Sequence, residues 1–316
     1  MTPREEPGRL RTVTGTIPTS AVTGPVLAHE HLQLDLRWPS RPAKAESVPD
    51  RWLDEEKAVT TELTRLRTDH GLGLVVDLTC GGMGRNASTL ARISAGSRVA
   101  VVASAGYFAE PFHPAHVRDT DVEQLAERLL AEIGFGMDGT GSLPGVIGEV
   151  GAWSDAPTPD EERALRACAR AARYSGLAVA ARGRAALAEL DILTAAGVAP
   201  SRIAVGRRDR ADDPAATRKI AESGAYVSFG SLGLAAGDPE ALDARVRAVL
   251  ELLDAGHADR ILLSTGISRM DHVTRYGGHG YAYTFDTFLP ALREAGADEP
   301  TLTKLTRDNP LTWLVG

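Results

Sequence analysis

Hydrophobic residues along this chain fall into short apolar runs that alternate with longer amphipathic stretches. The runs are rich in Val, Leu, Ile and Ala and end at Gly or polar turn residues, which is typical of buried strands. Eight such runs predict strands, over residues 24–32, 71–79, 97–108, 145–153, 176–183, 202–209, 225–232 and 260–268. The clearest amphipathic stretches predict helices over residues 50–70, 122–135, 158–174, 211–223 and 239–255.

Strands that alternate with helices predict a parallel sheet, and eight such units close most naturally into a (β/α)8 TIM barrel. We therefore expect one α/β domain over residues 1–316. A doubly wound open sheet is the alternative. It would place a Gly-rich dinucleotide-binding turn after the first strand, which instead runs into His29-Glu30-His31. In TIM barrels the chemistry occurs at the carboxyl ends of the strands, so functional residues are expected there.

The composition is that of a globular protein, with 316 residues, a formal net charge of −7 and two Cys. The N-terminal segment lacks the apolar stretch of a signal peptide, and no apolar run approaches the length of a membrane span. Few Cys fit a reducing cytoplasm, and an acidic balance without a basic tract argues against a nucleic-acid partner. We expect a cytoplasmic protein that acts on a small molecule, with neither nucleic acid nor a membrane as its partner.

Two histidines and a glutamate stand at strand ends. In His29-Glu30-His31 the period of a strand places both imidazoles on one face, the barrel interior, with Glu30 pointing away. Such a pair can present two nitrogens to a divalent metal, although hydrogen-bonded core histidines would look the same. Glu149 lies within the apolar run of residues 145–153, where a buried carboxylate requires a cation, a metal or a proton.

Arginines end two further strands, Arg182 in the run of residues 176–183 and Arg207 in the run of residues 202–209. A guanidinium at the carboxyl end of an inward-facing strand usually binds an anion or a carboxylate. Other candidates are weaker. Tyr107, Trp153 and Tyr281 fall in loops where the walls of a substrate pocket are expected, and Cys80 follows the second strand. Loop packing, or an ordinary buried thiol, is the simpler interpretation of each.

The residues at these strand ends resemble the phosphotriesterase-like family of the amidohydrolase superfamily. The resemblance is carried by GPVLAHEHLQLDLR at the first strand, VVDLTCGGMGRN after the second, GVIGEVG with TPDEERALRACARAA, and ADRILLSTGISRMDHVTRYGGHGYAYTFDTFLPAL. It implies a (β/α)8 barrel with two divalent metals bridged by hydroxide, which hydrolyses phosphoesters, lactones or related esters. It also implies a homodimer as one oligomeric state.

Three of the six metal ligands that the resemblance implies are present. His29 and His31 match the histidines of the first strand, and Glu149 matches the bridging position of the fourth. Arg182 and Arg207 stand where the family places histidines, and Gly266 stands where it places an aspartate. A protonated guanidinium has no lone pair for a metal, and glycine has no side chain.

The substitutions favour a metal-independent enzyme. Without metal, His29 and His31 would serve as acid and base, Glu149 would orient the charged groups, and Arg182 and Arg207 would hold a small anionic or carbonyl-containing substrate. Hydrolysis, elimination, isomerisation and cyclisation all suit such a site. One alternative is a mononuclear hydrolase of esters, lactones or phosphoesters, with Zn, Mn or Fe on His29, His31 and Glu149. Another is a relative that binds a small molecule without catalysis.

Overall fold

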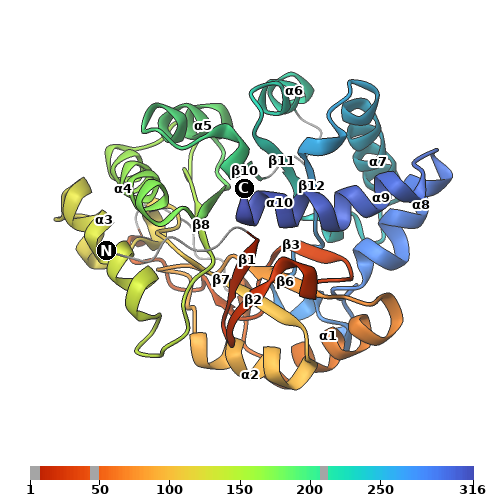
Figure 1. The fold of residues 1–316 in the computed structure, drawn as a ribbon, viewed down its shortest axis with the longest axis horizontal. Coiled ribbons are helices and arrows are strands. Elements are labelled where there is room, and N and C mark those ends of the chain that lie inside the picture. The colour runs from red at the N-terminus through yellow and green to blue at the C-terminus, as the bar shows by residue number, and fades with distance from the viewer. Residues whose placement is uncertain (1–7, 43–49, 207–212) are drawn as a thin grey trace.

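The computed structural model describes residues 8–42, 50–206 and 213–316, and its core is a barrel of parallel strands. Eight strands form one sheet in the order β12-β11-β10-β9-β8-β7-β6-β3, which follows the chain around the barrel. The two ends of the sheet meet, because the amide of His29 on β3 donates to Ser264 Oγ after β12 at 3.0 Å. Figure 1 shows the helices on the outside of these strands. The predicted (β/α)8 barrel is confirmed, and the doubly wound sheet is excluded.

The barrel strands are β3 (Val26–Glu30), β6 (Leu74–Asp77), β7 (Ala100–Ala105), β8 (Val146–Val150), β9 (Ala178–Ala181), β10 (Ile203–Val205), β11 (Tyr226–Phe229) and β12 (Ile261–Leu263). The helices are α1 (Glu56–His70), α2 (Ala87–Ser97), α3 (Val122–Phe135), α4 (Pro159–Ser175), α5 (Ala186–Ala195), α6 (Pro214–Glu222), α7 (Pro239–Asp254), α8 (Leu289–Glu294), α9 (Glu299–Thr303) and α10 (Asn309–Val315). Each predicted strand contains one of the barrel strands.

Two differences from the predicted helices have local causes. Residues 50–70 were expected to be helical throughout, but Trp52–Leu53 forms β5, which pairs antiparallel with β4 (Leu34–Asp35). Helix α1 therefore begins only at Glu56. The helix predicted from residue 211 begins at Pro214, because Asp213 caps it by accepting the amide of Ala216 at 2.8 Å.

The strands are buried on both faces, which explains their continuous apolar sequences. The barrel interior is filled by small and branched side chains such as Val26, Val76, Ala180 and Leu262, all nearly inaccessible to solvent. The opposite faces of the same strands pack against the helices in two further apolar clusters. The interior below the carboxyl ends is thus a packed core, and an open site can form only above it.

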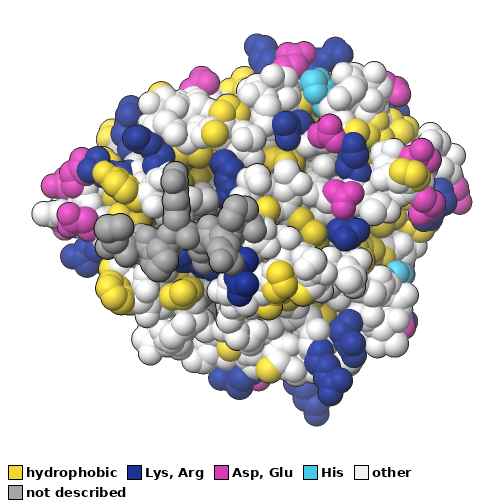
Figure 2. All heavy atoms as spheres, in the orientation of Figure 1, with side chains coloured by type: hydrophobic (Ala, Val, Ile, Leu, Met, Phe, Trp, Pro, Cys, Tyr) yellow, Lys and Arg dark blue, Asp and Glu magenta, His cyan; other side chains and the backbone are white. Residues whose placement is uncertain are grey.

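The amino-terminal end of the barrel is closed by two segments that the hydrophobic pattern did not predict. Strands β1 (Arg9–Thr12) and β2 (Gly15–Pro18) form a hairpin, and α10 lies beside it across the barrel end (Figure 1). Leu10 of the hairpin and Trp313 of α10 belong to the interior core. On this face, acidic and basic side chains lie beside one another at the left, the top and the right of the rim, whereas the lower rim carries mainly basic side chains (Figure 2). Among the described residues, no helix is long and apolar enough to cross a membrane.

Candidate functional site

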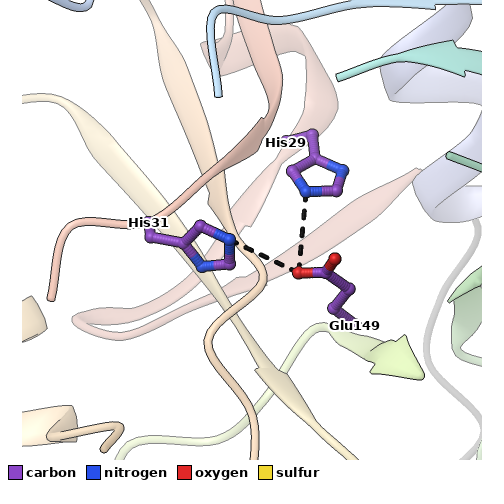
Figure 3. A group of neighbouring side chains, drawn as sticks. All are labelled: His29, His31 and Glu149. Atoms are coloured by element: carbon purple, nitrogen blue, oxygen red, sulfur yellow. Dashed lines mark ion pairs between the residues drawn. The ribbon is translucent and has the colours of Figure 1, made fainter. Parts of the chain in front are cut away.

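His29 and His31 lie on and just after β3, and both imidazoles point at one carboxylate, that of Glu149 (Figure 3). The pairing of β3 with β6 shifts register between Leu27 and Glu30, and this irregularity brings His29 inward although Val26 and Ala28 already face the interior. The His29 ring packs against Gly230, where an added Cβ would lie 2.7 Å from Nδ1. The prediction that both imidazoles share a face is confirmed.

Glu149 lies on β8 at the centre of the group. Its Oε2 is 3.7 Å from Nε2 of His29 and 3.3 Å from Nε2 of His31. All three side chains are nearly inaccessible to solvent. Strand β8 also shifts register against β9, between Ile147 and Val150, next to Glu149. A buried carboxylate of this kind requires neutralisation by a cation.

Arg182 supplies one such cation. Its Nη1 donates to Glu149 Oε1 at 2.6 Å and its Nη2 donates to Ser231 Oγ at 3.1 Å. Arg182 follows β9, whose Ala178 and Ala180 face the interior, so the alternation of the strand directs it inward as well. Arg207, the second predicted guanidinium, lies outside the described residues.

The hydrogen bonds of His31 define its tautomer. The Thr79 hydroxyl donates to the carbonyl of Gln33 at 2.9 Å, so its oxygen accepts from Nδ1–H of His31, also at 2.9 Å. In this tautomer the unprotonated Nε2 would turn a lone pair toward Glu149 Oε2, which has no hydrogen-bond donor among the described residues. Two lone pairs that face each other at this distance require a proton or a metal ion between them.

The charge states follow from burial and from Arg182. Burial, with the nearby Arg182 charge, lowers the pKa of His29 to about 3, so this imidazole is neutral at pH 7 and keeps a lone pair on Nε2. Burial alone would raise the pKa of Glu149, but Arg182 and the two imidazoles outweigh it and bring that pKa well below the ordinary value. Glu149 is therefore an anion, with Arg182 as its permanent counterion.

Glu30 turns away from this group, as expected from the sequence, although the register shift after Leu27 is what reverses its direction relative to Val26 and Ala28, and it binds the segment after β12. Its buried carboxylate accepts from Ser264 Oγ at 2.7 Å and from the amides of Thr265, Gly266 and Ile267 at 2.8–3.0 Å. Gly266 has a φ of +77°, and an added Cβ would lie 2.2 Å from the carbonyl oxygen of Gly230. At the position of the family's aspartate, this backbone holds Glu30 and has no room for a side chain.

The residues present suit one metal ion and not two. His29, His31 and Glu149 offer two nitrogens and one oxygen that lie within 4.8 Å of one another, which is a recognised ligand set for zinc and similar metals. The other oxygen of Glu149 is bound by Arg182, which has no lone pair to share, and position 266 offers no side chain. A second metal on the far side of Glu149 would therefore lack these protein ligands.

A cavity of about 320 Å³ opens above the group at the carboxyl ends of the strands. Its lining includes Arg182, Ser231 and the predicted Trp153. The other predicted pocket residues are buried elsewhere. Tyr281 donates to the carbonyl of His31 at 2.7 Å, and Cys80 donates to the carbonyl of Glu149 at 3.2 Å. Tyr107 packs in the core between the sheet and the helices.

Sequence reasoning missed Thr79, Ser231 and Arg184. Thr79 orients His31, Ser231 binds Arg182, and Arg184 lines the cavity. Thr79 and Ser231 lie at the carboxyl ends of predicted strands, and Arg184 comes directly after one. Their signal was a polar residue at the carboxyl end of a buried run, which is weak because such residues also begin ordinary turns.

Comparison with known proteins agrees with this geometry. The sequence model of the phosphotriesterase family matches residues 8–314. The chain is 34% identical to the phosphotriesterase homology protein of Escherichia coli over 291 residues, 91% of this chain and 97% of that protein. It is 30% identical to the N-acetyltaurine hydrolase of Rattus norvegicus, in an alignment that covers 97% of this chain and 98% of the relative.

Two crystal structures are similar over nearly the whole chain. The E. coli phosphotriesterase homology protein, with phosphate in its active site, superposes with a TM-score of 0.86, at 33% identity over 93% of this chain and 99% of the other. A resiniferatoxin-binding protein from Rhodobacter sphaeroides superposes with a TM-score of 0.90, at 32% identity over 99% and 97% of the two chains. The chain described here therefore belongs to the phosphotriesterase family and is an enzyme of the amidohydrolase superfamily.

Proposed function

We propose that this chain hydrolyses a small anionic substrate by acid–base chemistry, without a metal ion. The observation that carries the proposal is the 2.6 Å contact between Arg182 and Oε1 of the buried Glu149. This guanidinium gives Glu149 the positive neighbour that a bridging carboxylate otherwise obtains from metal. The hydrolytic activity is supported by the relatives named hydrolases, and the anionic substrate by Arg182 at the cavity.

In this proposal each residue of the site has a separate role. Arg182 contacts both the cavity and Glu149, so it can attract the anionic group of a substrate. His29 is buried beneath the cavity, so this proposal requires Arg182 to shift toward the anion and open a path from the substrate to His29. The neutral Nε2 of His29 accepts the proton of the attacking water, and the leaving group receives the proton that lies between His31 Nε2 and Glu149 Oε2. Thr79 holds the His31 ring in place, and the proton taken up by His29 then replaces the one given to the leaving group. Glu149 keeps the two imidazoles oriented.

A mononuclear metallohydrolase is the second candidate, and a different observation favours it. Oε2 of Glu149 has no hydrogen-bond donor among the described residues and lies at 3.3 and 3.7 Å from two imidazole nitrogens. Bound there, one divalent cation would supply Lewis-acid chemistry and a water of lowered pKa. His29, His31 and Glu149 would hold it, and Arg182 would keep its place on Oε1.

Metal content distinguishes the two candidates. The protein is purified without chelator, its Zn, Mn and Fe are measured per chain, and hydrolysis of mono-4-nitrophenyl glutarate is assayed before and after treatment with EDTA. We expect less than about 0.1 metal ion per chain and turnover that EDTA leaves unchanged. About one ion per chain, with turnover that depends on it, would establish the metallohydrolase instead.

Variants test whether the site is catalytic at all. His29→Gln and Arg182→Met should each lower kcat/KM at least 100-fold, a factor typical of lost acid–base or electrostatic catalysis. The matched control is Arg218→Met, because Arg218 is an exposed residue of α6 paired with Glu222. If no tested ester, lactone or amide is turned over by the parent protein, the non-catalytic interpretation holds.

A further inference from the structure

The cavity above the site has positively charged residues at two different depths. Arg51, Arg182, Arg184 and Arg269 all contribute to its lining, and no acidic residue does so among the described residues. Arg182 lies deepest, with its side chain 18% exposed and bonded to Glu149. The side chains of Arg184 and Arg269 are 53% and 34% exposed, so they lie toward the opening.

The guanidiniums near the opening have partners that a ligand can displace. Arg184 pairs with Asp155 at 2.8 Å, and Arg269 pairs with Asp50. Both aspartates are more exposed than the arginines they contact and are not part of the cavity lining. Ion pairs in contact with water contribute little, so a ligand carboxylate can take the place of either aspartate.

The cavity lining also includes apolar side chains. Phe108, Trp153 and Leu234 contribute to it, and the rings of Phe112 and Trp153 meet edge to face with centroids 5.5 Å apart. This wall is held from behind by buried carboxylates. Glu161 accepts the amide of Trp153 at 2.8 Å, and Glu189 accepts the amide of Ala152 at 3.0 Å. A wall held by buried hydrogen bonds is preorganised for a ligand.

We propose that Arg184 and Arg269 form a second anion subsite. This subsite selects a substrate in which an apolar segment separates a distal acidic group from the reacting end, and the reacting end carries either a second acidic group or the scissile group. The reacting end would lie at Arg182 and Ser231, the apolar segment against Phe108 and Trp153, and the distal acid at Arg184 and Arg269. A volume of about 320 Å³ is at the small end of the range for ligand sites. The assignment of the reacting end rests on the proposed function; the existence of the subsite does not.

Binding of non-reactive acids tests the subsite. Titration calorimetry would compare benzene-1,3-dicarboxylate, benzoate and benzamide on the intact protein at low salt. We expect the dicarboxylate to bind at least tenfold more tightly than benzoate, and benzamide more weakly than either. Arg184→Met and Arg269→Met should each weaken binding of the dicarboxylate about tenfold and that of benzoate less than twofold. Arg218→Met, an exposed arginine away from the cavity, should change neither.

Equal affinity for the dicarboxylate and benzoate, or no binding of either, would overturn the subsite. The subsite would also be overturned if Arg184→Met and Arg269→Met weakened the binding of both acids to the same extent, because that result indicates a general loss of positive charge. The proposed function fails separately, when turnover of mono-4-nitrophenyl glutarate is insensitive to His29→Gln and Arg182→Met. If that turnover depends on His29 but the protein binds the dicarboxylate no more tightly than benzoate, the subsite alone is rejected.

Discussion

The two oxygens of Glu149 have different partners, and this difference defines the chemistry of the site. Oε1 is bound by a guanidinium that cannot dissociate its proton in a protein, whereas Oε2 faces two imidazole nitrogens. A buried pair such as Arg182 and Glu149 depends on both members, because loss of one leaves an uncompensated charge. Arg182 therefore stabilises the barrel interior, and under the proposed function it also binds the anionic group of the substrate.

Restoring the family's aspartate at position 266 should not restore a metal ligand. Gly266→Asp places a Cβ 2.2 Å from the carbonyl oxygen of Gly230 at a residue with positive φ. We therefore expect the free energy of unfolding to fall by about 2–4 kcal/mol. Urea denaturation measures this. Gly237→Asp is the control, because Gly237 also has a positive φ but has open space around it. This variant should lower the free energy of unfolding by only about 1 kcal/mol. Equal costs would contradict the steric argument.

Glu189 should make stability depend on pH. Burial raises its pKa to about 7 from an ordinary value of 4.5. A raised pKa means that the folded protein holds the proton more tightly, so this stabilisation is complete below pH 4.5 and is lost as the pH rises through 7. Glu189→Gln cannot titrate. Its unfolding free energy, relative to the parent, should therefore rise by about 3 kcal/mol between pH 4.5 and 7.5.

Urea denaturation at several pH values measures this difference for Glu189→Gln. Glu251→Gln, on an exposed position of α7, is the control and should follow the parent at every pH. A difference between Glu189→Gln and the parent that does not change with pH would show that folding leaves the pKa of Glu189 unchanged.

Among the elements, α4 and α5 position the site from outside the barrel. Glu161 at the start of α4 accepts the amides of Glu110 and Trp153, which belong to two different loops. Glu189 on α5 accepts the amide of Ala152, beside the segment that carries Arg182 and Arg184. These helices therefore hold the loops after β7, β8 and β9 in register above the barrel.

The N-terminus of α4 should contribute measurably to stability. Thr158 accepts the amide of Glu161 at 3.3 Å, and Glu161 in turn accepts the amide of Thr158 at 2.9 Å, which forms a capping box. Thr158→Ala should lower the unfolding free energy by about 1 kcal/mol. Thr61→Ala, at an exposed position of α1, should change it by less than about 0.5 kcal/mol. Similar values for the two variants would show that the cap contributes nothing specific.

At the scale of the whole molecule, the barrel depends on a side chain near its C-terminus. Trp313 of α10 is fully buried and packs with the interior core at the amino-terminal end of the strands. Trp313→Ala should lower the unfolding free energy by about 3–5 kcal/mol because it opens a large cavity. Trp38→Ala is the control, because Trp38 is 80% exposed. This variant should lower the unfolding free energy by less than about 0.5 kcal/mol. A small effect at Trp313 would mean that α10 does not close the barrel.

Local signals explain which parts of the fold were predictable. Strands buried on both faces have continuous apolar sequences, so all eight barrel strands were found, and α4 was found from Thr158 and the residues after it. The hairpin of β1 and β2 and the pairing of β4 with β5 were missed. Each is short and is stabilised by contacts with distant segments, such as that of Val13 with Val101, which no local pattern reveals.

The sequence by itself determined the barrel, the strand ends at which the candidate site lies, and its residues His29, His31, Glu149 and Arg182. These follow from periodicity and from the cost of burying charge, which are properties of short segments. Only the tertiary structure decided that Arg182 binds Oε1 of Glu149, that Thr79 sets the tautomer of His31, and that the backbone at Gly266 holds Glu30. Those contacts join residues from different strands, and register shifts next to His29 and Glu149 break the alternation on which sequence reasoning depends.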